Sequence, residues 1–219
     1  MILSIIIPVG PDEPAPVKLL ANLQQVPGEI EILIPTAGSV PWTVPEPVRQ
    51  IESAQGRGRQ LNTAARQAAG RHLWFVHSDC SIAATAPETI MRFLNHNDAA
   101  LGYCRLRFAD DGPALTRLNA VGANLRSRWF GLPYGDQGLC LPRDWFERLG
   151  GFREDLDRGE DLDLVVRAKL AGLPVQPMGI DIETSARRYR EQGWLKTTFR
   201  HQVAAITLIR QARRKALSQ

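Results

Sequence analysis

Short apolar runs alternate with amphipathic segments through the first half of the chain. The apolar runs predict strands at Leu3–Pro8, Glu29–Pro35, Val48–Ser53 and Leu73–His77. The segments between and after them predict helices at Val17–Gln25, Arg59–Ala69 and Pro87–Leu94. Such alternation is typical of a largely parallel sheet that is covered by helices on both faces. We therefore expect an α/β fold.

The second half is less regular but keeps the same kinds of segment. We expect a strand at Leu101–Phe108 and helices at Ala114–Arg128, from Arg143, and at Asp161–Ala171. A final amphipathic helix is expected at about 193–216. No internal repeat or low-complexity linker separates these segments. We therefore expect a single domain over residues 1–219, with one half at about 1–108 and another at about 109–190.

Composition narrows the classes of function. The net charge of +4 suits anionic ligands but selects none of them. No Lys/Arg run is interleaved with aromatic residues, which argues against nucleic acid. The three cysteines are far apart, which argues against a disulfide framework or a zinc knuckle and for a reducing cytoplasm. The short apolar N-terminus lacks basic residues, so we interpret it as a strand, and no apolar run is long enough to cross a membrane.

Polar residues follow three of the expected strands, at Pro8–Glu13, Pro35–Ser39 and His77–Ser81. Ligands of open α/β sheets bind beyond the carboxyl ends of the strands. In the third segment, His77 and Asp79 project the same way from an extended chain. An Asp oxygen suits Mg²⁺ or Mn²⁺, and imidazole suits Mn²⁺. The pair is either a metal site or a strand end whose polar residues cap the next turn.

Two further segments carry charge at the start of an expected helix. The stretch "GRGR" places Arg57 and Arg59 where backbone N–H groups and cations could face a phosphate, although a plain turn with solvated arginines explains it as well. The stretch "GEDLD" opens the helix at Asp161–Ala171. Carboxylates there cap the helix, but the flexible glycine before them also allows Asp161 to be aimed into a cleft.

Taken together, these segments resemble family 2 glycosyltransferases of the GT-A fold. The similarity extends from "SIIIPV" through "GRGRQLNTAARQAAGRHLWFVHSDC" to "YGDQGLCLPRDWFERLGGFREDLDRGEDLDLVVRAKLAG". It is strongest with a small bacterial subgroup that has a His-x-Asp metal motif. The resemblance implies that the first half binds a nucleotide-sugar donor, that the second half binds the acceptor, and that Mg²⁺ or Mn²⁺ is the cofactor.

The resemblance also implies a role for individual residues. It assigns the metal to Asp79, with His77 on the metal or on the sugar or ribose, and it assigns the general base to Asp161. It gives the donor pocket Pro8, Thr36, Arg57, Arg59, Asn62 and Ser78. It gives the acceptor side Asp136, Gln137 and Glu160. Two positions depart from the family pattern, because Thr36 replaces a base-binding Asp and the first loop has Asp12 and Glu13 in place of Asn-Glu, so recognition of uracil does not carry over.

The expected function is metal-dependent, inverting transfer of a sugar from a nucleotide-sugar donor to an acceptor hydroxyl. Two alternatives stay open, a non-catalytic nucleotide-sugar binder of the same fold and a sugar-phosphate nucleotidyltransferase. The second would carry a basic, glycine-rich loop after the first strand, and Pro8–Ala15 has no basic residue.

The C-terminal helix has apolar residues on one side and many cations. Such a helix can lie on an anionic membrane surface, which would suit a lipid-linked acceptor at the inner face of the membrane. It equally fits packing against the domain or against a second subunit.

Overall fold

The computed structural model describes residues 2–24, 29–38, 40–83, 86–97, 99–199 and 207. Its strands are β1 (Leu3–Ile6), β2 (Ile30–Ala37), β3 (Arg49–Ser53), β4 (His72–Phe75), β5 (Cys80–Ile82), β6 (Leu101–Phe108), β7 (Leu139–Pro142) and β8 (Val175–Thr184). Its helices are α1 (Val17–Leu23), α2 (Arg57–Gln67), α3 (Ala86–His96), α4 (Thr116–Phe130), α5 (Arg143–Arg148), α6 (Glu160–Leu170), α7 (Arg187–Gln192) and the 3₁₀ helix η1 (Gly135–Gln137).

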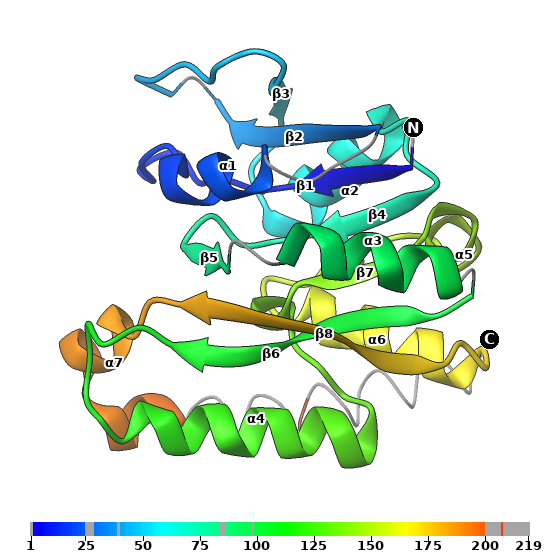
Figure 1. Cartoon of the computed structure of the whole chain (residues 1–219). Helices are drawn as coiled ribbons and strands as arrows, with labels where there is room; N and C mark the ends of the chain where they lie inside the picture. The colour runs from blue at the N-terminus through cyan, green and yellow to red at the C-terminus, as the bar shows by residue number, and fades with distance from the viewer. Residues whose placement is uncertain are drawn as a thin grey trace.

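The strands form one sheet in the order β3-β2-β1-β4-β7-β6-β8-β5 (Figure 1). Strands β1 to β4 are parallel where they pair, as the alternation of strands and helices predicts. Strand β7 runs antiparallel to β4 and to β6. Because of that reversal, residues that precede β7 reach the same edge of the sheet as residues that follow β4. This edge is where the predicted site residues of both halves meet.

Helices cover both faces of the sheet, as expected for strands that are buried on both sides. Strand β1 alternates its apolar side chains between two cores, with Ile5 in one and Ile6 in the other. The first core is closed by apolar residues of α1 and α3, and the second by those of α2, α5 and α6. Figure 1 shows α1 and α3 on one side of the sheet and α2 and α6 on the other. The predicted α/β class is confirmed.

The hydrophobic pattern does not predict several elements, most of which lie in the second half of the chain. Strands β5 and β7 are only a few residues long, and β8 contains Pro177 and Gly179, which interrupt an apolar pattern. Helix α7 consists mostly of polar residues. Of the expected C-terminal helix, residues 194–199 and Thr207 are helical, and residues 200–206 and 208–216 lie outside the described part of the chain. Within the described part of the chain, no helix has the length and apolar content needed to cross a bilayer.

Candidate active site

The edge of the sheet beyond β1 and β2 is held in place by one buried side chain of α2. The amide of Gln60 donates to the carbonyl oxygen of Val9 at 2.8 Å and to that of Pro35 at 3.1 Å. The loop after β1 is closed by Glu13, whose carboxylate accepts from the Gly10 N–H at 3.1 Å. The same carboxylate accepts from the Ser78 hydroxyl at 2.8 Å, which ties the loop after β1 to the loop after β4.

Side chains from two separate segments converge on Gly135 in η1. A Cβ atom built on this glycine would lie 2.7 Å from Oδ2 of Asp161 and 2.8 Å from Nε2 of His77, so the site has room only for a hydrogen at this position. The Gly135 N–H donates to Oδ2 of Asp161, and the Leu162 N–H donates to its Oδ1 at 2.8 Å. The imidazole that follows β4 and the carboxylate that opens α6 therefore share one small space.

A narrow cavity lies beside this point. Its lining combines Pro8, Gly135 and apolar side chains with four of the polar residues that the sequence singled out: Arg57, His77, Glu160 and Asp161. Arg57 comes from the start of α2, directly after Gly56, whose φ of +121° suits only glycine. The Nε atom of Arg57 lies 3.7 Å from Oε1 of Glu160. A cation, a neutral ring and two carboxylates thus face one cavity.

Burial and neighbouring carboxylates raise the pKa of two carboxyl groups of the site, Glu160 and Asp136. Burial and the neighbouring Asp161 raise the pKa of Glu160 to about 7, against the opposing effect of Arg57. Burial raises the pKa of Asp136 to about 6, with further contributions from Asp161 and Asp79 and an opposing one from Arg126. One oxygen of Asp136, Oδ1, is buried and has no hydrogen-bond partner among the described residues. Such a concentration of negative charge favours a cation.

The imidazole of His77 is in a different electrostatic state. Removal from water lowers its pKa well below 6.5, and the positive charges of Arg57 and Arg188 lower it further. The ring is therefore neutral at physiological pH, and a neutral ring nitrogen can accept a hydrogen bond or bind a metal without first losing a proton. This state fits the predicted role of His77 on the metal or the sugar.

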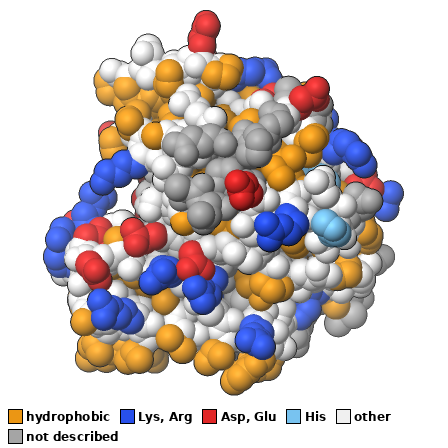
Figure 2. Space-filling model, viewed as in Figure 1, with side chains coloured by type: hydrophobic (Ala, Val, Ile, Leu, Met, Phe, Trp, Pro, Cys, Tyr) orange, Lys and Arg blue, Asp and Glu red, His pale blue; other side chains and the backbone are white. Residues whose placement is uncertain are grey.

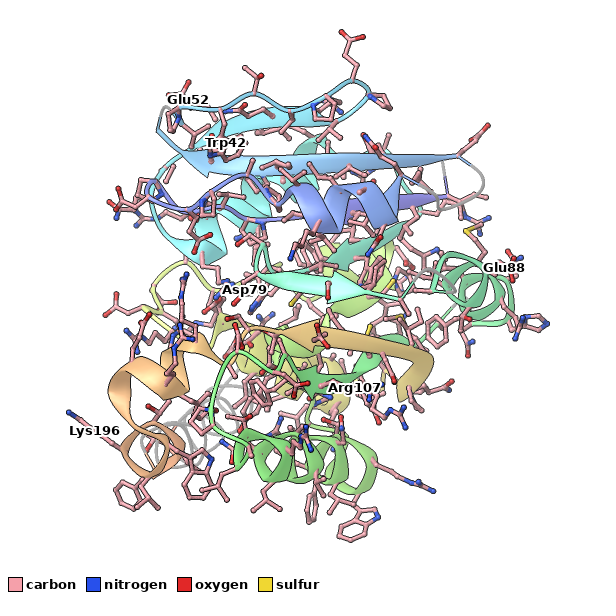
Figure 3. All side chains as sticks on the ribbon, turned by 60° about the vertical axis from the view of Figure 1, so that its left-hand side comes forward. Trp42, Glu52, Asp79, Glu88, Arg107 and Lys196 are labelled. Carbon is pink, nitrogen blue, oxygen red and sulfur yellow. The ribbon has the colours of Figure 1, made fainter. Side chains whose placement is uncertain are left out.

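Three other residues that were predicted to bind the donor or the metal do not line this cavity. Asp79 is exposed, and it lies where the part of the molecule built by β1 to β4 meets the part built by β6, β8 and α7 (Figure 3). Arg59 is exposed, with its Nε 3.9 Å from Glu154. Thr36 is 1% exposed, and its hydroxyl accepts from Gln50 at 3.5 Å inside the sheet.

Asn62 and Gln137 use their amides to brace the two halves. The Asn62 side chain donates to the Phe152 carbonyl oxygen at 2.8 Å and accepts from the Phe152 N–H at 2.9 Å. The fully buried Gln137 accepts from the Ser127 hydroxyl at 2.7 Å and donates to the Cys104 carbonyl oxygen at 3.1 Å. The contacts of Gln137 fix the backbone of η1, which also contains Gly135 and Asp136.

Two arginines of the site do not stand out in the sequence. Arg126 of α4 lies 3.4 Å from the centre of the Tyr134 ring and donates to the Leu132 carbonyl oxygen at 2.8 Å, and its charge acts on Asp136. Arg188 of α7 is close enough to affect His77. The run "RRYREQ" marks α7 as basic, but only the placement of β8 brings that helix to the site.

Comparison with known sequences finds no match, neither to a family model nor to a curated protein. Comparison with solved structures does. The structure matches residues 1–349 of S. aureus TarS in complex with UDP-GlcNAc with a TM-score of 0.64 and 17% identity, over 85% of this chain and 59% of that chain. It matches the mannosyltransferase PcManGT from Pyrobaculum calidifontis, in complex with GDP-Man and Mn²⁺, with a TM-score of 0.60 and 19% identity, over 82% of this chain and 56% of that chain.

The chain spans less than two thirds of either of these structures, and at this level of identity the likeness is one of fold. The predicted fold is confirmed: this chain has the GT-A fold of nucleotide-sugar glycosyltransferases.

Proposed function

We propose that this chain is a glycosyltransferase that moves a sugar from a nucleotide-sugar donor to an acceptor hydroxyl with inversion at the anomeric carbon. The observation that carries the proposal is the convergence of His77 and Asp161 on Gly135 beside a cavity that also contains Arg57. UDP-GlcNAc in the TarS structure and GDP-Man in PcManGT support the class of donor.

The donor is expected along the edge that Gln60 fixes, with its diphosphate toward Arg57. The guanidinium of Arg57 is partly exposed. Its ion pair with Glu160 is loose, because Nε and Oε1 are 3.7 Å apart. A diphosphate would compete well for this cation, because hydrogen bonds between a guanidinium and phosphate are charge-assisted. Arg188 adds a second positive charge near His77.

The residues present fit a divalent cation. Asp79 is exposed, and the buried Oδ1 of Asp136 lacks a hydrogen-bond partner among the described residues. Within that part of the chain, no three ligating side chains are already grouped around one point. Mg²⁺ commonly uses one or two carboxylates and completes its shell with substrate phosphates and water. Asp79 would hold the ion, with His77 beside it, and when bound the ion neutralises charge on the departing diphosphate.

Asp161 is the proposed general base. Each of its oxygens accepts one backbone N–H, which fixes the carboxylate and leaves a second lone pair on each oxygen for an acceptor hydroxyl. In the reaction, the acceptor oxygen attacks the anomeric carbon, its proton passes to Asp161, and the bond between that carbon and the diphosphate oxygen breaks. The products are the glycoside and the nucleoside diphosphate.

The first test asks whether a metal ion and the nucleotide bind together. We expect nucleoside diphosphates to raise the melting temperature in the presence of Mn²⁺, and Asp79→Ala to remove that rise without lowering the melting temperature of the free protein, because Asp79 is exposed. Thermal-shift measurements with and without Mn²⁺ check this. Full metal-dependent stabilisation of the Asp79→Ala variant would contradict the assignment.

The second test separates the base from its neighbour. Asp161→Asn keeps the size of the side chain and removes its basicity, so turnover should fall by about 10²–10⁴-fold with nearly unchanged donor affinity. Glu160→Gln is the matched control and should lose less. Transfer to an acceptor, or hydrolysis of the donor, is measured for both variants.

The same measurements on the variants and on the parent chain also test the alternatives. If Glu160→Gln loses more turnover than Asp161→Asn, Glu160 is the base. If the parent chain binds the donor but neither transfers nor hydrolyses the sugar under any condition, the chain is a non-catalytic binder.

A further inference from the structure

Helix α4 buries small residues and exposes large apolar ones. The residues that it buries against the sheet are small: Thr116, Ala120, Ala123 and Ser127. The opposite side carries large apolar residues at helical spacing, with Leu118 61% exposed, Val121 55%, Leu125 38% and Trp129 69%. A helix that only packs on its own domain has the reverse arrangement. The exposed face needs another reason.

A second apolar segment lies beside this face. The helical turn at residues 194–199 is tied to α4 by a hydrogen bond of 2.9 Å from Asn119 to Thr198. Leu195 is 76% exposed and Phe199 is 72% exposed. In Figure 1 this turn lies against the first part of α4, and in the matching view of Figure 2 apolar side chains line the lower edge of the molecule over α4. We call this surface, formed by α4 and residues 194–199, the apolar edge.

Cations border the apolar edge, and one of them, Arg117, is paired with Asp110 at 3.2 Å. Helix α4 has Arg117, Arg126 and Arg128 and no acidic residue. At 100° per residue, Arg117 and Arg128 fall next to the apolar stripe. The sequence from Trp194 to Gln219 contains six Lys and Arg residues and no Asp or Glu. Apolar residues with a cationic border are typical of helices that lie in an anionic membrane interface.

We propose that the apolar edge docks onto an anionic lipid surface, with the side chains of Leu118, Val121 and Trp129 entering the interface. A second copy of the chain fits less well, because a symmetric contact would place this cationic border against itself. Anionic headgroups instead neutralise it. From Leu118 to Trp129 the face spans about 16 Å of helix, which lets several side chains enter one flat surface together.

The apolar edge and the candidate site belong to one connected unit. The chain leaves α4 at Gly131 and reaches η1 within a few residues, and Arg126 of α4 stacks on Tyr134 next to Gly135. In Figure 3, Lys196 projects sideways from the lower part of the molecule, away from Asp79. Docking would therefore leave the site uncovered. The proposal does not depend on the proposed function, since it concerns a different surface and a different measurement.

The test is flotation of the full chain with vesicles of phosphatidylcholine alone and of phosphatidylcholine mixed with phosphatidylglycerol. We expect flotation with the mixed vesicles, weakened by added salt because exposed charges are screened. The double variant Leu118→Gln/Trp129→Gln should partition about tenfold or more less, since each change removes a large apolar group from the interface. Val17→Gln is the matched control, because Val17 is 67% exposed on α1.

Other results would overturn the proposal. The proposal is wrong if the parent chain does not float with the mixed vesicles. It is also wrong if the parent and the double variant float equally well. A dimer in light scattering that the double variant abolishes, with vesicle binding unchanged, would assign the face to a second copy. Thermal melting confirms that each variant is folded.

Discussion

Burial and the neighbouring carboxylate of Asp161 act on the pKa of Glu160 in the same direction, and the charge of Arg57 opposes them. The side chain of Glu160 is almost fully buried, Asp161 adjoins it, and its pKa rises to about 7 from an ordinary 4.5. The folded chain thus prefers the neutral acid. This preference stabilises the fold fully below pH 4.5, and the stabilisation is lost as the pH rises through about 7.

Glu160→Gln should therefore flatten the dependence of stability on pH. The variant keeps the shape of the neutral acid, so at pH 5 it should match the parent closely. At pH 8 it should be more stable than the parent by about 1–3 kcal/mol, because each pKa unit is worth about 1.4 kcal/mol. Urea unfolding at the two pH values measures the difference. Glu52→Gln is the control: this exposed residue lies far from the site (Figure 3) and should change neither value.

At the scale of elements, η1 decides how closely His77 and Asp161 approach. Gly135→Ala would place a methyl group within 3 Å of both side chains, which could move aside without unfolding the chain. We expect a loss of stability of about 1–3 kcal/mol from overpacking, and a loss of turnover of about tenfold to a hundredfold from misplaced groups. Melting curves and transfer rates measure the two effects. Full turnover in this variant would show that the close approach has no role.

The glycine of α4 provides a matched control. A Cβ atom on Gly122 meets nothing within 4 Å, and the residue is exposed in the middle of a helix. Gly122→Ala should stabilise the chain by about 0.5–1 kcal/mol through helix propensity and leave turnover unchanged.

The elements differ in how well the sequence predicts them. Strands β1 to β4 have apolar runs between turn residues, and their predicted positions agree with the structure within a few residues. Strand β8 pairs with β6 over a long register, but Pro177 and Gly179 disguise it in the sequence. The order of the strands, with β7 between β4 and β6, depends on contacts between distant residues and cannot be derived from local pattern.

The same distinction applies to site residues. A residue that follows a buried strand or opens a helix is placed by its element, which is why Arg57, His77 and Asp161 each stand out in the sequence. Their grouping into one site is an implication of the resemblance. An amide gives no such indication. Whether Asn62 faces a ligand or the backbone of Phe152 depends on what lies opposite, and that residue is 90 positions away. The sequence also predicts α4 without indicating which of its faces is buried.

At the scale of the whole molecule, the two halves share one sheet and both of the cores that flank it. The Phe152 ring, from the second half, packs on Phe75 of β4 with ring centres 4.8 Å apart, and its backbone is held by Asn62 of α2. We call the edge of the sheet beyond β1 and β2 the donor edge, after its proposed role. The contacts of Phe152 fix this edge relative to the acidic residues of α6. The apolar edge lies at the opposite end of this sheet from β3, so contact with a surface there would leave the donor edge open (Figure 1).

One contact within the donor edge has a thermodynamic consequence. Because a single amide of Gln60 holds the carbonyl groups of Val9 and Pro35, the spacing between the ends of β1 and β2 exists before any ligand arrives. A ligand that binds there does not have to order these two backbones, and this lowers the entropic cost of association. Selectivity at this edge would then come from the fit of the ligand to a rigid frame, rather than from a frame that adapts to each ligand.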